Sequence, residues 1–113
     1  MFGLMQAADE VFHAIADANR RKLLDMLADG DLPAQELASH FAISFAAVSQ
    51  HLKVLHEAGL VKRRAAGRQR IYSLNPVRLR AVDDWTARYR KFWQSRMKRL
   101  RLYLDTGGSE AKD

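Results

Sequence analysis

The segment from Ile43 to Val61 constrains the fold of this chain more than any other. Three of its apolar residues recur at steps of four and three, and therefore share one face of a helix: Val48, Leu52 and Leu55. Ser44 is a suitable N-cap, and Gly59 can adopt the left-handed conformation that ends a helix. The segment predicts a short amphipathic helix whose other face carries small and polar side chains.

Three further helices are expected before this segment. The first runs from Phe2 to Ala16, and the second from Ala18 to about Asp29 with Asp17 as its N-cap. The third runs from Ala34 to Phe41, where Pro33 suits the first turn. Only a few residues separate the third helix from the fourth, which is the spacing of a helix-turn-helix.

After Gly59 the pattern changes from helical to extended. Residues 60–64 and 69–74 have the composition of two strands, and Ala65–Arg68 predicts the turn between them. From Pro76 to Leu104 the helical pattern is uninterrupted, so one closing helix of about 29 residues is expected. Large apolar side chains form a stripe along it: Val82, Trp85, Tyr89, Phe92, Trp93, Met97, Leu100 and Leu104.

Charge is distributed unevenly along the chain, whose net charge is +6. Residues 1–59 hold four basic against eight acidic residues, whereas residues 60–74 hold five basic residues and no acid. Residues 75–101 hold nine basic against two acidic residues. A positive field concentrated in the hairpin favours a polyanionic partner, although the basic residues of the last helix also fit an ordinary solvated face.

These elements predict a mainly α winged helix-turn-helix with a small β-hairpin wing. We expect residues 1–105 to form one DNA-binding and dimerisation domain, and residues 106–113 to form a disordered tail. No apolar run approaches the roughly 20 residues that cross a bilayer, and the start lacks the basic region of a secretory signal. A cytoplasmic protein that does not bind membranes is therefore expected.

The small, polar face of the helix at 43–61 suits a DNA major groove. Its candidate contacts are Ser44, Phe45, Ala46, Ser49, Gln50 and His51, with Lys53 on a backbone phosphate. In the wing, the candidates for phosphate or minor-groove contacts are Arg64, Arg68 and Arg70. Two choices stay open: Phe45 either touches a thymine methyl or packs inside the domain, and His51 faces a phosphate, a base or its neighbours on the same helix.

Three blocks of the sequence resemble the ArsR/SmtB family of bacterial repressors. They are Val11–Leu24, Ser49–Leu55 followed by Ala58–Val61, and Gly67-Arg68 before Ile71–Leu74. The aromatic last helix is similar to the metal-free branch that includes SdpR-like autorepressors. The resemblance covers about residues 5–105 and implies a homodimeric repressor that binds double-stranded DNA, with the first and last helices at the dimer interface.

Apolar surface left uncovered by a small winged core also predicts a homodimer that reads an inverted repeat. The expected interface residues are Phe2, Leu4, Met5, Trp85, Tyr89, Phe92, Trp93 and Leu100. An alternative interpretation of the aromatic residues on the last helix is a ligand pocket.

The metal sites of the family do not carry over to this chain. Its third-helix cysteines are matched by Ala38 and His40, the chain has no cysteine, and no histidine follows His56. We therefore expect no metal and no other cofactor, whereas a small-molecule effector is left open.

Two other classes of function were weighed. A winged-helix docking module with an acidic partner has little need for a wing of five basic residues without an acid. An enzyme is not expected, because there is no cysteine nucleophile, no evident Ser-His-acid set and no Gly-rich phosphate loop.

Overall fold

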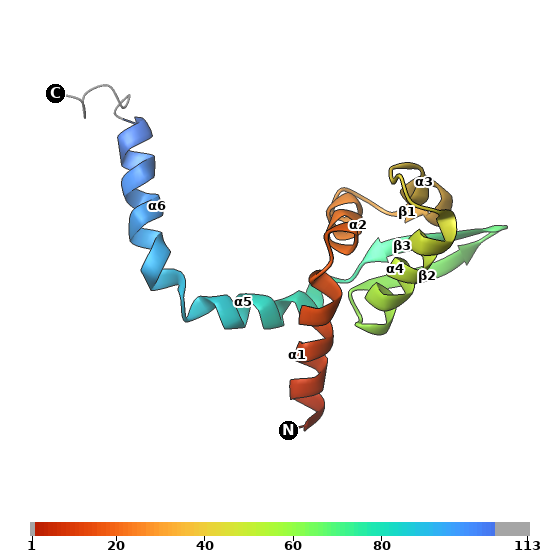
Figure 1. Cartoon of the computed structure of the whole chain (residues 1–113), viewed down its shortest axis with the longest axis horizontal. Coiled ribbons are helices and arrows are strands. Elements are labelled where there is room, and N and C mark those ends of the chain that lie inside the picture. Colours follow the sequence, from red (N-terminus) through yellow and green to blue (C-terminus); the bar gives the residue numbers. More distant parts are fainter. Residues whose placement is uncertain (1, 106–113) are drawn as a thin grey trace. The chain divides into compact units, whose positions relative to one another are not determined.

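The computed structural model describes the backbone of residues 2–105 and the side chains of residues 6–105. The chain forms two compact units, the winged unit up to Val82 and a C-terminal unit from Asp83 onward. The elements are, in order, α1 (Phe2–Ile15), α2 (Ala18–Ala28), β1 (Leu32–Pro33), α3 (Ala34–Ser39), α4 (Phe45–Glu57), β2 (Val61–Ala66), β3 (Gln69–Leu74), the 3-10 helix η1 (Pro76–Leu79), α5 (Arg80–Ala87) and α6 (Arg90–Asp105) (Figure 1).

Helices α2 and α4 begin at the residues predicted to cap them, whereas α3 ends at Ser39, two residues before the predicted end at Phe41. The Asp17 carboxylate accepts hydrogen bonds from the backbone N–H groups of Asn19 at 2.8 Å and Arg20 at 3.1 Å. Ser44 Oγ accepts the N–H of Ala47 at 3.1 Å and so caps α4. Each cap satisfies N–H groups that have no partner inside their own helix, which fixes the first turn.

The end of α4 is a Schellman motif. The N–H of Leu60 donates to the carbonyl of Leu55 at 2.9 Å, and the N–H of Gly59 donates to the carbonyl of His56 at 3.0 Å. Gly59 has a φ of 77°, and a Cβ there would lie 2.7 Å from Nε of Arg78. The position therefore requires glycine both for its conformation and for space.

Apolar residues from four helices and the sheet form one core in the winged unit. The buried residues are Val11, Ala14, Leu23, Leu24, Leu27, Leu37, Val48, Leu52, Leu55, Ala58, Leu60, Val61 and Tyr72. The stripe predicted for α4 is the part of that helix that enters the core. Since burying a leucine contributes about 1.5–3 kcal/mol, these side chains are what holds α4 in place.

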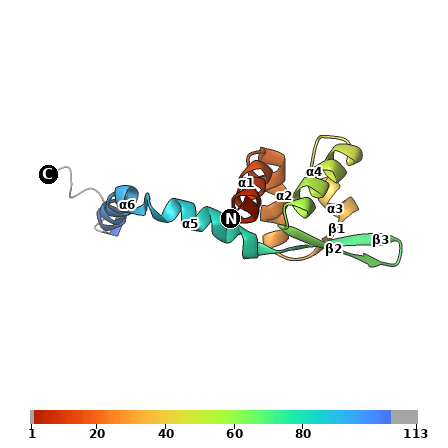
Figure 2. The same ribbon diagram turned by 90° about the horizontal axis from the view of Figure 1, so that it is seen from below.

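The wing belongs to a three-stranded antiparallel sheet with the order β1-β3-β2. Helices α2, α3 and α4 lie on one side of this sheet, and the β2–β3 hairpin extends beyond them (Figure 2). The strands pair from Val61 opposite Leu74 to Ala66 opposite Gln69. The loop is thus only Gly67-Arg68, shorter than the predicted turn, and Gly67 has the positive φ of 64° that a two-residue hairpin needs.

Strand β1 was not expected from the sequence. Pro33 pairs opposite Ile71 and has extended backbone angles, so it precedes α3 and does not form its first turn. A strand of two residues is too short to show an alternation of side chains, so only its pairing with another strand identifies it.

The prediction of one closing helix from Pro76 to Leu104 is wrong. The described chain has η1 there, then α5, and then α6 after a break at Arg88 and Tyr89. The backbone hydrogen bonds at the break span three residues. The N–H of Tyr89 donates to the carbonyl of Thr86 at 2.8 Å, and the N–H of Phe92 donates to the carbonyl of Tyr89 at 3.0 Å.

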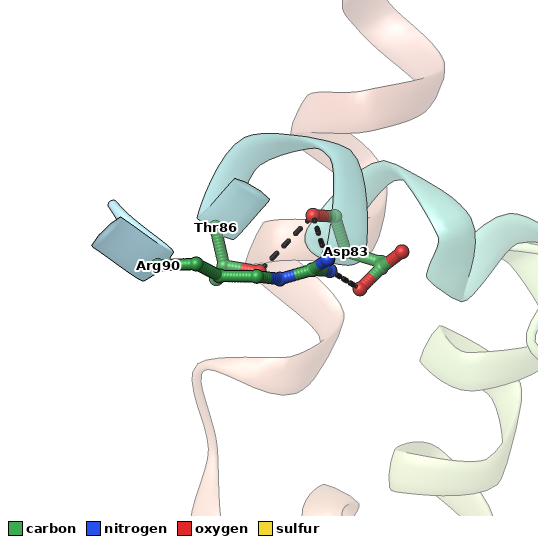
Figure 3. A network of polar contacts seen from close by, with 3 residues as sticks. All are labelled: Asp83, Thr86 and Arg90. Atoms are coloured by element: carbon green, nitrogen blue, oxygen red, sulfur yellow. Dashed lines mark hydrogen bonds and ion pairs between the residues drawn. The ribbon is translucent and has the colours of Figure 1, made fainter. Parts of the chain in front are cut away.

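Side-chain donors account for the break (Figure 3). Thr86 Oγ1 donates to the carbonyl of Asp83 at 3.1 Å, and the Arg90 guanidinium reaches that same carbonyl at 3.5 Å. Arg90 also forms an ion pair with the Asp83 carboxylate. Threonine bonding back to a carbonyl bends a helix, and hydrophobic periodicity carries no sign of it.

Two of the predictions concern parts of the chain that lie outside this description. The side chains of Phe2, Leu4 and Met5 are not among the described ones, so their interface role stays a prediction. The disordered tail expected at 106–113 also stays a prediction. No helix within residues 2–105 combines the length and the apolar character that a membrane span requires.

Candidate nucleic-acid interface

A groove of about 540 Å³ lies between the N-terminal half of α4, the hairpin and the start of α3. It collects seven of the ten side chains predicted to contact DNA: Phe45, Ala46, Ser49, Gln50, Lys53, Arg68 and Arg70. The remaining residues that line it are Pro33, Ala34, Gln35, Arg63, Gln69 and Tyr72. Sequence-distant residues thus meet on one surface of the winged unit.

The α4 wall of the groove presents a reading face formed by Ala46, Ser49, Gln50 and Lys53. Their spacing of three, one and three places them on the side of α4 opposite the buried stripe. Phe45, at the first turn, is 51% exposed, so it does not pack inside the domain. Ser44 lies outside the groove, and its hydroxyl is engaged as the N-cap of α4.

Strand register decides which arginines of the wing reach the groove. Residues paired across an antiparallel ladder share a face, so Arg63 lies with Tyr72, and Ala65 with Arg70. Tyr72 is buried, which turns this face toward α4. Arg64 lies opposite Ile71 on the other face and forms an exposed ion pair with Asp31 at 3.8 Å.

Arg64, which was predicted to contact DNA, therefore lies outside the groove, whereas Arg63, which was not among the predicted residues, lines it. The alternation of the strand contained the signal, because Val61 is apolar and residues two apart point to the same face. Counting from Val61 leads to Arg63. Gln35 and Gln69 were also missed, since each lies at the end of a short element where no periodicity marks its direction.

The groove is cationic and rich in hydrogen-bonding groups. Lys53, Arg63, Arg68 and Arg70 line it, and the lining residues include no carboxylate. Gln35, Ser49, Gln50 and Gln69 add neutral donors and acceptors. Basic side chains attract phosphates, and side-chain amides can distinguish base edges, so the groove has what a double-helical polyanion requires.

His51 lies outside the groove. The side chain is half-buried, and its Nδ1 lies 3.4 Å from Nη1 of Arg20 in α2. The structure thus places His51 against α2, a contact that was not among the alternatives open at the sequence level. Asp17 belongs to the same region, and the pKa of its carboxyl is lowered, first by the hydrogen bond from the Arg20 N–H.

The predicted interface residues of the C-terminal unit are exposed. Trp85, Tyr89, Phe92, Trp93 and Leu100 all belong to this group, and the rings of Trp85 and Tyr89 lie 5.4 Å apart in a tilted arrangement. Two shallow grooves on α6 are lined by Leu100 and by six residues outside this group, Gln94, Met97, Lys98, Arg101, Leu104 and Asp105. Neither groove is built from the aromatic side chains for which a ligand pocket was considered.

Comparison with known proteins identifies the family. Residues 17–63 match the model of the bacterial regulatory protein, arsR family. The HTH-type transcriptional regulator Rv2034 of Mycobacterium tuberculosis is 38% identical over 105 residues, which cover 93% of this chain and 95% of that protein. The transcriptional repressor SdpR of Bacillus subtilis is 40% identical over 77 residues, which cover 68% and 86% of the two chains.

A solved structure gives the same answer for the fold. The ArsR-like transcriptional regulator from Rhodococcus sp. RHA1 aligns with a TM-score of 0.67 and 27% identity, covering 88% of this chain and 94% of that one. The predicted winged helix-turn-helix and the family resemblance are confirmed, and so is the expectation that the protein is not an enzyme. The chain belongs to the arsR family of bacterial regulatory proteins and is a DNA-binding transcriptional regulator.

Proposed function

We propose that this protein is a homodimeric repressor that binds an inverted-repeat operator and does so without a metal. The observation that carries the proposal is the groove, in which the reading face of α4 and the basic side chains of the wing meet. Affinity and discrimination come from different parts of this surface.

Discrimination comes from the N-terminal half of α4. Gln50 is exposed on the reading face and can form two hydrogen bonds with an adenine edge in the major groove. Ser49 beside it donates or accepts, and the exposed ring of Phe45 suits a thymine methyl. The small side chain of Ala46 lets the helix approach the bases closely.

Affinity comes mainly from the wing. Arg68 is at the tip of the hairpin, and Arg63 and Arg70 line the groove behind it. Their phosphate contacts release counterions, so the logarithm of the binding constant falls by about 0.9 for each contacted phosphate per decade of salt. Several such contacts in each of two subunits make binding steeply salt-dependent.

Dimerisation follows from the exposed apolar surface of the C-terminal unit. Trp93, Met97, Leu100 and Leu104 recur at steps of four, three and four on one side of α6, and each is at least 46% exposed. A helix of this length is marginal in water unless its apolar side packs against something. Pairing with the same helices of a second copy covers the surface, and two-fold symmetry places the reading helices on half-sites about 34 Å apart.

Repression is the regulatory direction that the relatives favour. SdpR, which is 40% identical over 77 residues, is named a transcriptional repressor. A dimer bound across a promoter blocks access of the transcription machinery, and this needs no catalytic group on the protein.

Independence from metal is supported by the residues at the family-type positions. Ala38 and His40 stand where metal-sensing relatives have cysteines, and the chain contains no cysteine. The Lys22 ammonium in α2 donates a hydrogen bond to the carbonyl of His40 at 2.6 Å, so a contact within the protein holds the end of α3 against α2. Zinc or nickel added to the operator complex should leave the binding curve unchanged.

Footprinting on the DNA upstream of its own gene, with a reporter assay, tests the proposal. We expect two protected half-sites in inverted orientation and lower reporter expression when the protein is present. Equal affinity for this DNA and for random DNA would overturn the assignment of a reading face. Raised reporter expression would overturn repression alone.

A matched pair of variants tests the wing. Arg63→Ala should weaken binding to all sequences and reduce the salt slope by about 2, because it removes one phosphate contact in each of the two subunits. Arg64→Ala, one residue away on the opposite face, should leave both quantities unchanged. Equal losses for the two variants would show that the wing docks differently from the arrangement proposed here.

A further inference from the structure

One guanidinium group joins three helices of the winged unit. Nε of Arg20 in α2 donates to the carbonyl of Ala14 at 2.7 Å, and Nη2 donates to the carbonyl of His13 at 3.1 Å. Nη1 of the same group lies 3.4 Å from Nδ1 of His51 in α4. All three nitrogen atoms of Arg20 are thus engaged, and two of them hold the last turn of α1.

The chemistry of the two side chains fixes the direction of the contact with His51. Arginine donates hydrogen bonds and cannot accept them, so Nδ1 of His51 must be the acceptor. The carbonyls of His13 and Ala14 lie at the C-terminus of α1, where a positive charge is favourable, and the carbonyl of His13 also accepts a hydrogen bond from the Ala16 N–H at 3.2 Å.

The α2 side of this junction is also held firmly. Asp17 caps α2 through the N–H groups of Asn19 and Arg20, and Arg21 donates to the carbonyl of Ile15 at 2.8 Å. Arg20 therefore projects from a corner whose two helix ends are both capped. A side chain that projects from this corner can hold the imidazole of His51 in a defined position.

His51 follows Gln50 directly along α4, so its position sets the rotation of the reading face about the helix axis. The helix has a radius of about 5–6 Å including side chains, and a rotation of 20° therefore moves a side-chain end by about 2 Å. A displacement of that size breaks a hydrogen bond between an amide and a base edge. The buried stripe holds α4 on the core, whereas the polar contact at His51 adds a directional constraint.

We propose that Arg20 and His51 are positioning residues, which set the angle of the reading face and thereby operator discrimination without touching DNA. The inference rests on the proposed function of the α4 reading face. It removes His51 from the set of base contacts expected from the sequence and gives Arg20, which was not among the candidates, a role in specificity.

The experiment compares affinity for the footprinted operator with affinity for random DNA of equal length, at one salt concentration. His51→Leu introduces an apolar side chain of similar size that cannot accept a hydrogen bond. This variant should lower operator affinity about tenfold while random-DNA affinity stays unchanged. His51→Asn restores an acceptor near the place of Nδ1 and should keep operator affinity within about twofold of wild type. His56→Leu, on the same helix and outside the groove, is the matched control.

A double-mutant cycle distinguishes positioning from direct contact. Arg20→Lys keeps the charge but loses the planar fork, and should reproduce the effect of His51→Leu. The double variant should then bind the operator no more weakly than either single variant, because both remove the same contact. Additive losses would overturn the proposal, since they would mean that His51 contacts DNA on its own.

Two further outcomes separate this inference from the proposed function. Wild-type protein that fails to discriminate between operator and random DNA would overturn the proposed function. Wild type that discriminates, together with a His51→Leu variant that discriminates equally well, would overturn the positioning role alone. Equal losses of operator and random-DNA binding, together with a lowered melting temperature, would also overturn the positioning role. If Arg20→Lys does not fold, the His51→Leu variant alone tests the proposal.

Discussion

Leu55 in α4 is fully buried, whereas Leu100 in α6 is 49% exposed, although each belongs to the apolar side of an amphipathic helix. In the winged unit, apolar side chains of α1 to α4 meet those of the sheet. In the described part of the C-terminal unit, neither α5 nor α6 has a buried residue. The same sequence pattern thus serves two purposes: it builds a core within one chain, and it leaves a surface for association.

The polar sides of the two helices differ as well. The reading face of α4 carries small side chains and amides, with Lys53 as its one basic residue. Helix α6 carries six basic residues on a chain segment of 16. Hydrogen-bonding groups can discriminate among bases, whereas dense positive charge only attracts polyanions, which is why the proposed function assigns specificity to α4.

The largest effect is expected from a leucine deletion in each helix. Leu55→Ala should lower the free energy of unfolding by about 2–5 kcal/mol, because it leaves a cavity in the core. Leu100→Ala should change it by less than about 0.5 kcal/mol in dilute, monomeric protein, since the site is half-exposed there. Urea unfolding at low protein concentration measures both. Comparable losses would contradict the division between core and association surface.

The second effect concerns association. Trp93 is 46% exposed and lies on the apolar side of α6, and Trp93→Ala should weaken the dimer by about 2 kcal/mol, or roughly 30-fold in Kd. Leu102 is 55% exposed but lies on the opposite side of the helix, which makes Leu102→Ala the matched control. Sedimentation velocity over a concentration series gives the two constants. A monomeric wild type at micromolar concentration would remove the basis of the comparison.

A smaller effect is expected from hydroxyl groups at helix ends. Ser44→Ala removes the cap of α4 and should lower the free energy of unfolding by about 1 kcal/mol. Thr86→Ala removes the hydroxyl bond at the break between α5 and α6, and should leave the unfolding of the winged unit unchanged. Thermal melts followed by near-ultraviolet circular dichroism test this distinction. It would be wrong if both variants shifted the unfolding transition of the winged unit.

The smallest effect is a pH dependence within the winged unit. The lowered pKa of the Asp17 carboxyl, caused first by the Arg20 N–H, means that the folded state favours the ionised form. Its contribution to stability is therefore present above the ordinary carboxyl pKa and is lost as the pH falls through the lowered value. Asp17→Asn keeps a capping oxygen but does not ionise. Urea unfolding across the acidic range should show wild type losing stability relative to this variant, and parallel curves would contradict the assignment.

Prediction from the sequence was strongest where the signal is local. Val48, Leu52 and Leu55 form the buried side of α4, and Ser44 caps it, as their spacing and chemistry indicate. Seven of the ten predicted DNA contacts line one groove, and all of these except Arg68 belong to a helix or strand whose faces can be counted. The other three, Ser44, His51 and Arg64, lie outside the groove.

The sequence by itself determined the helix-turn-helix, its caps, the basic hairpin and the family, because capping, side-chain period and charge are properties of neighbouring residues. Tertiary structure alone decided that β1 pairs with β3, that Arg64 pairs with Asp31, and that Arg20 meets His51. It also decided that the closing helix breaks after α5, where Asp83, Thr86 and Arg90 interact. Each of these depends on where a side chain or strand finds its partner, and a one-dimensional pattern contains no such distance.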